Sequence, residues 1–171
     1  MLSYRHGFHA GNHADVLKHL VLHEALRYLV GKPAPLRYID THAGPGSSPL
    51  GGGFSARTGE FLDGIGRIWS STDLPEPLRR YRELVKGFNP EGSLGRYPGS
   101  PLVTSAVLRL EDRGFLFELH PADATELEIA LGSDRRFRVA KFDGLAALRG
   151  LLPPPDRRAF VLIDPPYERD E

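Results

Sequence analysis

The motif Asp164-Pro165-Pro166-Tyr167 places a carboxylate, two prolines and an aromatic ring directly after an apolar run. Each proline lacks an N–H group, has its φ angle fixed near about −65° and restricts the residue before it. The loop is therefore rigid, and its carbonyls have no local donor. An exocyclic amine fits it, because the amine can donate to Asp164 and to the Pro165 carbonyl while Tyr167 stacks on the attached ring. The alternative is a proline-stiffened turn at the end of a strand.

Further acidic residues stand at equivalent places along the chain. Patterns typical of buried strands cover Leu36–His42, Gly114–His120, Phe137–Asp143 and Ala159–Asp164. At or near the ends of these strands stand Asp40, Glu118, Asp143 and Asp164. Ligands of an open parallel sheet bind outside the carboxyl ends of its strands. One such acid is more often part of a turn, but four in the same position favour a binding site.

Two of these strand ends suggest a nucleoside ligand. Glu118 could accept hydrogen bonds from ribose hydroxyls, as acids do after the second strand of dinucleotide-binding folds. Asp143 and Gly144 could bracket an adenine ring. After the first strand, Gly44 and Gly46 allow the backbone to turn tightly and approach a ligand. This glycine pattern also fits a simple turn.

Helical spacing of apolar residues lies between the strands, over Ala14–Leu29, Pro101–Leu110, Ala122–Leu131 and Gly144–Leu152. Strands that alternate with helices predict an α/β fold with a parallel sheet. The first two strands, however, are too far apart for one ordinary crossover. Two further apolar stripes occupy this interval, over residues 61–69 and 78–88, and the prolines of DLPEP separate them. We therefore predict an α/β core from residues 1–46 and 99–171, and an inserted helical subdomain over 47–98.

The composition excludes several classes of protein. The chain has 171 residues, 22 basic and 22 acidic side chains and no cysteine. Disulfides and thiolate metal sites are thereby excluded. No apolar stretch approaches the roughly 20 residues that span a bilayer, and residues 1–15 lack the apolar core of a signal peptide. The cytoplasm is the expected compartment. Zero net charge gives no overall support for nucleic-acid binding, although a local positive face remains possible.

Such a face could lie near the N-terminus, where five of the seven histidines fall in the first 23 residues. His9 and His13 are four residues apart, as are His19 and His23, so a metal site is one interpretation. The HExxH pattern is absent, and Asn12 fits a helix cap better. His19 could equally be a buried polar contact. The stretch YRHGFH mixes aromatic and basic groups, which suits contacts with unpaired RNA bases and phosphates, or simply a packed N-terminal arm.

Taken together, these motifs resemble an S-adenosylmethionine-dependent N6-adenine methyltransferase. More narrowly, the sequence resembles the bacterial family that methylates N6 of one adenine in 23S ribosomal RNA. The similarity runs from MLSYRHGFHAGNHADVLKH at the start to LIDPPYE near the end. It includes YIDTHAGPG, RTGEFLDGIGRIW, YPGSPL and ELHP. It covers only the N-terminal three-fifths of the family's length, so the chain is expected to end just past the catalytic loop, with the later strands missing.

The resemblance implies a Rossmann-like methyltransferase fold with an inserted helical subdomain and S-adenosylmethionine as cofactor. Asp164 would be the catalytic residue at the target amine. The implied cofactor-binding residues are His19, His42, Ser100, Glu118, Asp143 and Gly144. The implied substrate-binding residues are Tyr4, His6, Lys18, Pro165 and Tyr167. No metal is implied.

The expected partner is 23S rRNA, either free of ribosomal proteins or early in assembly, and the expected state is a monomer away from membranes. Three alternatives stay open on the sequence. One is an adenine methyltransferase that acts on DNA or on another RNA. Another is a non-catalytic nucleotide- or RNA-binding module. The most remote is a metal-dependent hydrolase. The DPPY motif alone does not separate the first of these from the leading interpretation.

Overall fold

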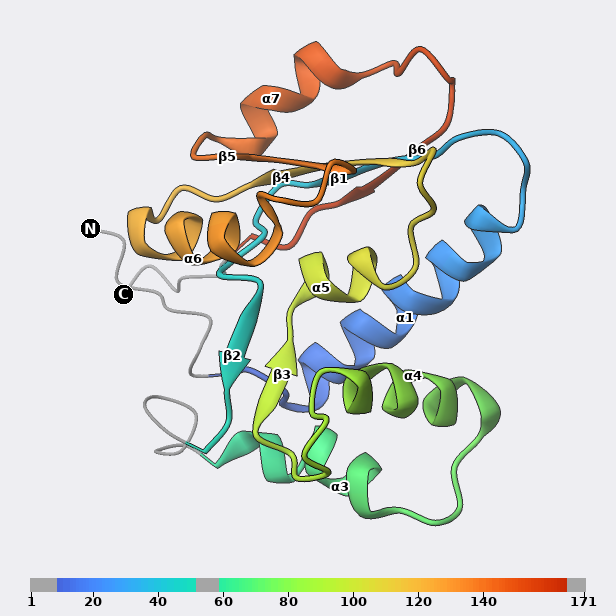
Figure 1. Ribbon diagram of the computed structural model, residues 1–171, viewed down its shortest axis with the longest axis vertical. Coiled ribbons are helices and arrows are strands. Elements are labelled where there is room, and N and C mark those ends of the chain that lie inside the picture. Colours follow the sequence, from blue (N-terminus) through green and yellow to red (C-terminus); the bar gives the residue numbers. More distant parts are fainter. Residues whose placement is uncertain (1–8, 52–58, 166–171) are drawn as a thin grey trace.

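The computed structural model describes residues 9–51 and 59–165, and its centre is a four-stranded parallel sheet (Figure 1). The strands are β1 (Arg37–Asp40), β4 (Arg113–Phe117), β5 (Phe137–Ala140) and β6 (Ala159–Leu162). Their order in the sheet is β5-β4-β1-β6. All four predicted strands and their parallel arrangement are confirmed.

Burial explains why β1 forms the middle of the sheet. Tyr38 and Ile39 point to opposite faces of the strand, and both are fully buried. Leu116 of β4 is also fully buried. A strand covered on both faces needs apolar residues in succession, which is the pattern that the sequence shows.

Helices cover both faces of the sheet. Figure 1 shows α7 on one face and α1, α5 and α6 on the other. Their bounds are α1 His13–Val30, α5 Ser100–Ser105, α6 Pro121–Leu131 and α7 Gly144–Leu151. No helix in the described part of the chain is both long and apolar enough to cross a bilayer.

The strand order places a crevice at one edge of the sheet. From β1 the chain moves outward to β4 and then to β5, and it returns to the other side of β1 as β6. The order therefore reverses beside β1. Ligands of open α/β sheets bind outside the carboxyl ends of the strands at such a reversal.

Helix α1 begins where the sequence suggested a cap. The Asn12 side chain accepts a hydrogen bond from the Asp15 N–H at 3.0 Å, and this bond satisfies one of the donors at the helix start. Leu22 and Leu26 pack into the core, whereas Leu17 and Val21 lie on the exposed side. The helix thus presents one apolar face to the domain.

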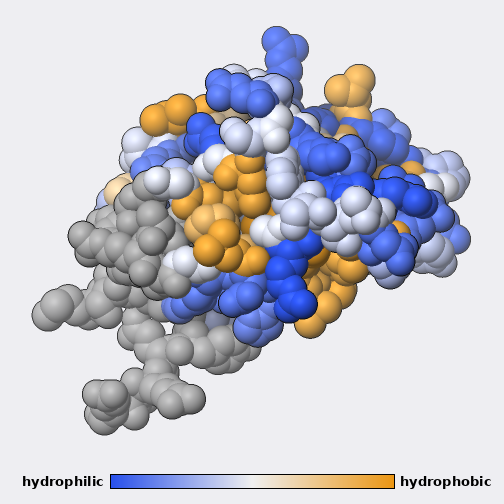
Figure 2. All heavy atoms as spheres, turned by 90° about the horizontal axis from the view of Figure 1, so that it is seen from below, coloured by the Kyte–Doolittle hydropathy of each residue, from blue (hydrophilic) through white to orange (hydrophobic). Residues whose placement is uncertain are grey.

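The segment between β1 and α5 contains β2 (Ser47–Pro49), the 3₁₀ turn η2 (Glu60–Leu62), α3 (Ile65–Ser70), α4 (Glu76–Gly87) and β3 (Arg96–Pro98). Strands β2 and β3 pair antiparallel, so the two ends of the segment lie side by side. Figure 2 views the molecule from the α3–α4 end, where hydrophilic residues surround smaller apolar clusters. The division into a core and an inserted subdomain stays a prediction.

Two helix predictions were wrong in their limits. The helix predicted over Pro101–Leu110 ends at Ser105, because the Asp112 carboxylate accepts the Arg109 N–H at 2.8 Å and draws the chain into a turn. The stripe over residues 61–69 forms η2 and α3 instead of one helix. At the break, a Cβ on Gly64 would lie 2.1 Å from the Gly11 carbonyl oxygen, and the Gly64 backbone is not helical.

Candidate active site

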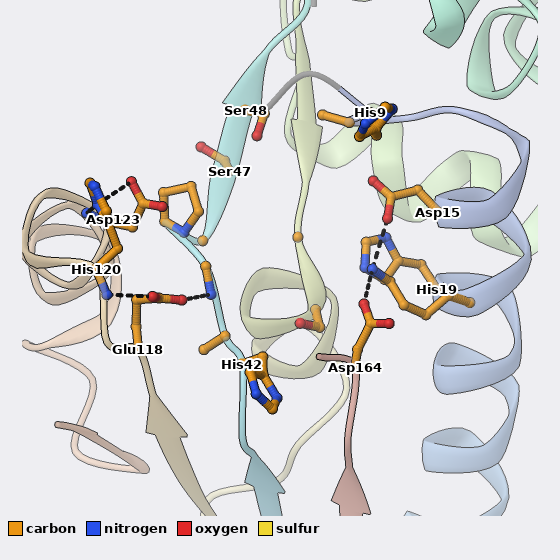
Figure 3. Close-up of a pocket in the computed structure, with 18 of the residues that line it drawn as sticks. His9, Asp15, His19, His42, Ser47, Ser48, Glu118, His120, Asp123 and Asp164 are labelled. Carbon is orange, nitrogen blue, oxygen red and sulfur yellow. Dashed lines mark hydrogen bonds and ion pairs between the residues drawn. The ribbon is translucent and has the colours of Figure 1, made fainter. Parts of the chain in front are cut away.

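A pocket of about 590 Å³ opens at the carboxyl ends of the strands, between α1 and the loops that follow β1, β4, β5 and β6 (Figure 3). Predicted site residues from separate parts of the chain line it. They are Lys18, His19, His42, Ser100, Glu118, Asp143, Gly144, Asp164 and Pro165. Tyr4, His6 and Tyr167 lie outside the described residues.

The side of the pocket at β4 is fixed by backbone hydrogen bonds. Glu118 accepts the Gly44 N–H at 2.9 Å with one carboxylate oxygen and the His120 N–H at 2.7 Å with the other. A carboxylate has about four lone-pair sites. Glu118 is therefore held in one orientation and retains acceptor sites for a pair of hydroxyls.

The end of β5 continues this side of the pocket. Asp143 caps α7, because its carboxylate accepts the N–H groups of Leu145 and Ala146 at 2.9 and 3.1 Å. Gly144 is the next residue, and a Cβ there would lie 2.4 Å from the Cα atom of Thr41. The start of α7 can approach the end of β1 only because residue 144 has no side chain. This part of the pocket wall is therefore formed by backbone atoms.

The side of the pocket at β6 is organised differently. The Lys18 ammonium lies 2.7 Å from an oxygen of Asp164 and 2.7 Å from an oxygen of Asp15. Asp15 is buried, whereas the Asp164 side chain is about one-third exposed. Burial on its own would lower the pKa of Lys18, but Asp15 and Asp164 outweigh it and the pKa is raised. The lysine is therefore charged at neutral pH.

Asp40 does not line the pocket, although it belongs to the predicted series of strand-end acids. It is fully buried and accepts the hydroxyls of Tyr38 at 2.8 Å and Ser100 at 2.7 Å. Burial raises its pKa, and the hydrogen bonds from Ser100, Tyr38 and the His42 N–H offset part of this effect. Asp40 thus lies behind the pocket wall and supports Ser100, which lines the pocket. After β1, the residues that line the pocket are those of the following loop, 41–46.

A tyrosine that sequence reasoning did not select also lines the pocket. The Tyr97 ring stacks on His19 with ring centroids 5.5 Å apart, and its hydroxyl lies 3.1 Å from His19 Nδ1. The same hydroxyl lies 2.8 Å from the Tyr81 hydroxyl of α4. The sequence contains the first tyrosine within YPGSPL and the second within an apolar stripe, but neither pattern reveals the contact.

His9 and His13, four residues apart in the sequence, do not form a pair in the structure. His9 lies 2.9 Å from Glu60, which also accepts the Asn12 side-chain amide at 3.0 Å. These bonds join the start of α1 to η2. His13 is the first residue of α1, so His9 and His13 do not share a helical face. Within residues 9–51 and 59–165 no group of three or more histidines and acids is placed to hold a metal ion.

The parallel sheet, its reversal at β1 and the pocket beyond its carboxyl edge define a methyltransferase-like α/β fold. A solved structure shows the same architecture: protein LPL1258 from Legionella pneumophila matches at a TM-score of 0.87 with 39% sequence identity. The match covers 94% of this chain and 59% of that protein.

The family model described as ribosomal RNA large subunit methyltransferase D, RlmJ, matches residues 32–171, and the chain belongs to this family. It is 52% identical to ribosomal RNA large subunit methyltransferase J of Escherichia coli and 48% identical to the protein of that name from Haemophilus influenzae. Each alignment covers 98% of this chain. The chain spans 60% of the length of these relatives.

Proposed function

We propose that this domain, in a chain of its relatives' full length, transfers a methyl group from S-adenosylmethionine to the N6 amine of one adenine in 23S rRNA. The observation that carries the proposal is the place of Asp164. Its carboxylate lies just past the end of β6, next to Pro165 and across the pocket from Glu118 (Figure 3). Asp143 lines the same pocket. A group that binds an amine and groups suited to a nucleoside therefore share a single cavity.

The pocket fits the proposed cofactor in size and in chemistry. Its volume lies within the range of about 300–1,000 Å³ that is typical of small-molecule sites. The remaining acceptor sites of Glu118 suit the two ribose hydroxyls. The backbone wall at Gly144, which has no side chain, suits a flat adenine ring. His19, His42 and Ser100 line the opposite part, where we place the methionine end. When bound, the cofactor supplies an electrophilic methyl group.

The target amine would take the place of Lys18 at Asp164. An ammonium group and an exocyclic amine both donate hydrogen bonds to a carboxylate, and the ammonium is already 2.7 Å from Asp164. An incoming amine can displace this donor without leaving the carboxylate unpaired, since Lys18 keeps its contact with Asp15. Asp164 is therefore ready to accept an amine hydrogen.

Most of the rate enhancement would come from positioning. Hydrogen bonds from the amine to Asp164 and to the Pro165 carbonyl direct the nitrogen lone pair toward the methyl group. The amine loses a proton only after it has become cationic, so Asp164 need not be a strong base. Its carboxylate holds that proton near the site until water removes it.

The relatives' names supply the class of substrate, and both are called ribosomal RNA large subunit methyltransferases. We infer that the substrate is 23S rRNA before it is covered by ribosomal proteins, because the amine must leave its base stack to enter a cavity beside a sheet. We further propose that the protein acts as a monomer in the cytoplasm. Tyr4, His6, Lys18 and Tyr167 are the residues that we assign to RNA contacts.

Methyl incorporation tests the proposal. The full-length form, a chain that carries this sequence and extends to the length of its relatives, is incubated with S-adenosylmethionine and deproteinised 23S rRNA from a strain that lacks the activity. We expect mass spectrometry to find one N6-methyladenine per rRNA. Preferential methylation of duplex DNA would overturn the substrate assignment. Failure to bind S-adenosylmethionine would overturn the assignment as an enzyme and favour a binding module.

A further inference from the structure

Three buried side chains from distant parts of the sequence form one hydrogen-bonded row. His19 Nδ1 of α1 forms a hydrogen bond with the Tyr97 hydroxyl of β3, and this hydroxyl forms a second one with the Tyr81 hydroxyl of α4. Each of the three is at most 1% exposed. His19 and Tyr97 line the pocket, whereas Tyr81 belongs to the segment between β1 and α5. The row therefore connects that segment to the pocket wall.

The direction of the hydrogen bonds follows from the buried end of the row. In the described part of the chain, the Tyr81 hydroxyl bonds only to Tyr97. If His19 donated to Tyr97 and Tyr97 to Tyr81, the Tyr81 proton would have no acceptor, and a buried donor without a partner is strongly unfavourable. The other direction satisfies all three groups: Tyr81 donates to Tyr97, and Tyr97 donates to His19 Nδ1.

Both hydroxyls remain protonated over the working range of pH, as this direction requires. Burial is the main cause that raises the pKa of each tyrosine well above its usual value, and the nearby Asp15 carboxylate adds to it. The position of α4 is also fixed. Arg80, next to Tyr81, makes two contacts with Glu24 of α1, at 2.6 and 3.3 Å.

We propose that Tyr97, oriented by Tyr81, is a positioning residue that fixes the tautomer and ring orientation of His19. With Nδ1 accepting from Tyr97, the neutral imidazole carries its proton on Nε2. His19 then presents an N–H donor, which suits the carboxylate of an amino acid. This inference rests on the proposed function for the identity of the ligand, the methionine end of S-adenosylmethionine. The tautomer itself does not depend on that identity.

The test uses Tyr97→Phe and Tyr81→Phe, which remove one hydroxyl each and keep the rings. Nitrogen NMR of the His19 imidazole reports the tautomer without ligand, and calorimetry with S-adenosylhomocysteine reports affinity. In the wild type we expect the Nε2–H tautomer. Tyr97→Phe should give a mixture of tautomers and raise the Kd about 3- to 12-fold, the size of one ordinary hydrogen bond. Tyr81→Phe should act in the same direction with a change of about 2- to 4-fold, because it weakens the row only indirectly.

Two control variants separate positioning from packing. Tyr28→Phe removes an exposed hydroxyl from α1, and Lys86→Gln removes an exposed ion pair with Glu83 within α4; both should leave the tautomer and the Kd unchanged. A lower melting temperature in Tyr97→Phe with an unchanged tautomer and Kd would overturn the proposal. If the wild type binds no S-adenosylhomocysteine, the proposed function fails, and the NMR comparison still decides whether Tyr97 sets the tautomer.

Discussion

The two sides of the pocket are held by different kinds of contact. On the β4–β5 side, Glu118 and Asp143 each accept two backbone N–H groups, and Gly144 lets the backbone itself form the wall. On the β6 side, Asp164 is paired with the ammonium of Lys18, a long side chain that has several rotatable bonds. One side is built from the main chain and the other from an exchangeable pair of side chains.

This difference suits the two tasks that we propose for the pocket, which are to hold a cofactor and to receive a target amine. A backbone donor cannot move away without unfolding a loop, so we expect Glu118 to keep the same orientation when a ligand binds. An ammonium on a flexible stem can leave and return. We therefore expect the β4–β5 side to determine affinity for a cofactor, and the β6 side to accept a succession of amines during turnover.

The sharpest way to break the comparison is Asp164→Asn in the full-length form. The amide keeps the size of the side chain but replaces one acceptor oxygen with a donor, which opposes the target amine. We expect the methylation rate to fall about 10²- to 10³-fold, as when one group that stabilises a transition state is removed, while cofactor affinity changes little. Single-turnover kinetics at saturating cofactor measure the effect. Asp156→Asn, at an exposed position before β6, is the matched control.

Turnover close to that of the wild type in Asp164→Asn would show that this carboxylate does not act on the amine. A large loss of cofactor affinity in the same variant would show that the two sides of the pocket are not separate in function. Either result would remove the distinction between a cofactor side and a target side.

Glu118→Gln tests the other side. An amide NH₂ group there would face either the Gly44 or the His120 N–H, so at least one backbone hydrogen bond is lost. Because hydrogen bonds to charged groups contribute about 1.5–3 kcal/mol, we expect cofactor affinity to fall about 10- to 150-fold. The single-turnover rate at saturating cofactor should stay near that of the wild type. Calorimetry with S-adenosylhomocysteine measures the affinity, and Glu126→Gln on the exposed face of α6 is the control.

An equal loss of affinity in Glu126→Gln would attribute the effect to net charge and not to the strand-end position. A Glu118→Gln variant with normal affinity and slow methyl transfer would reverse the roles that we give to the two sides.

The sequence predicted the elements that depend on local apolar spacing. The four strands and most of α1, α6 and α7 follow directly from it. It failed for β2 and β3, which are three residues long, contain prolines and pair with each other across an interval of about 50 residues. No local pattern marks such a ribbon. The end of α5 was also misplaced, because it depends on Asp112, whose carboxylate also binds Leu36 in a distant part of the chain.

The site was predictable as a set of residue types at strand ends, but its contacts were not. The position of Glu118 follows from the end of β4. The pairing of Lys18 with Asp164 joins residues 146 positions apart. The contact between Tyr81 and Tyr97 joins a helix residue to a strand residue, and neither stands out in the sequence from an ordinary core residue. Asp40 shows the reverse error, since its position at a strand end did not bring it into the pocket.

Gly144→Ala tests whether the β4–β5 side really depends on the backbone. The added Cβ would lie 2.4 Å from the Thr41 Cα and carbonyl oxygen, which are main-chain atoms that cannot turn aside. We expect a loss of about 1–3 kcal/mol in the free energy of unfolding, as for other overpacked sites, measured by chemical denaturation. Gly150→Ala in the same helix is the control. No atom lies within 4 Å of its added Cβ, so it should be neutral or stabilising by up to about 1 kcal/mol. Equal effects in the two variants would show that the close approach at Thr41 is unimportant.

The smallest expected effect concerns the pH dependence of the exchangeable pair. The carboxylates that face the Lys18 ammonium are Asp15, Asp164 and, less directly, Asp40. Because the pKa of Lys18 is raised in the folded protein, its contribution to stability is fully present below the unfolded pKa of 10.5 and is lost as the pH rises through the higher, folded value.

Lys18→Met isolates this contribution, since alkaline ionisation of the buried tyrosines is common to both proteins. We expect the stability difference between wild type and Lys18→Met to stay constant from about pH 7 to 10. It should then shrink above the unfolded pKa, by about 0.5–1 kcal/mol for a partly exposed pair. Thermal unfolding from pH 7 to 11 measures both proteins. A difference that already shrinks near pH 8 would show that Lys18 loses its proton in the neutral range, and it would contradict the charged pair at Asp164 on which the exchange with a target amine depends.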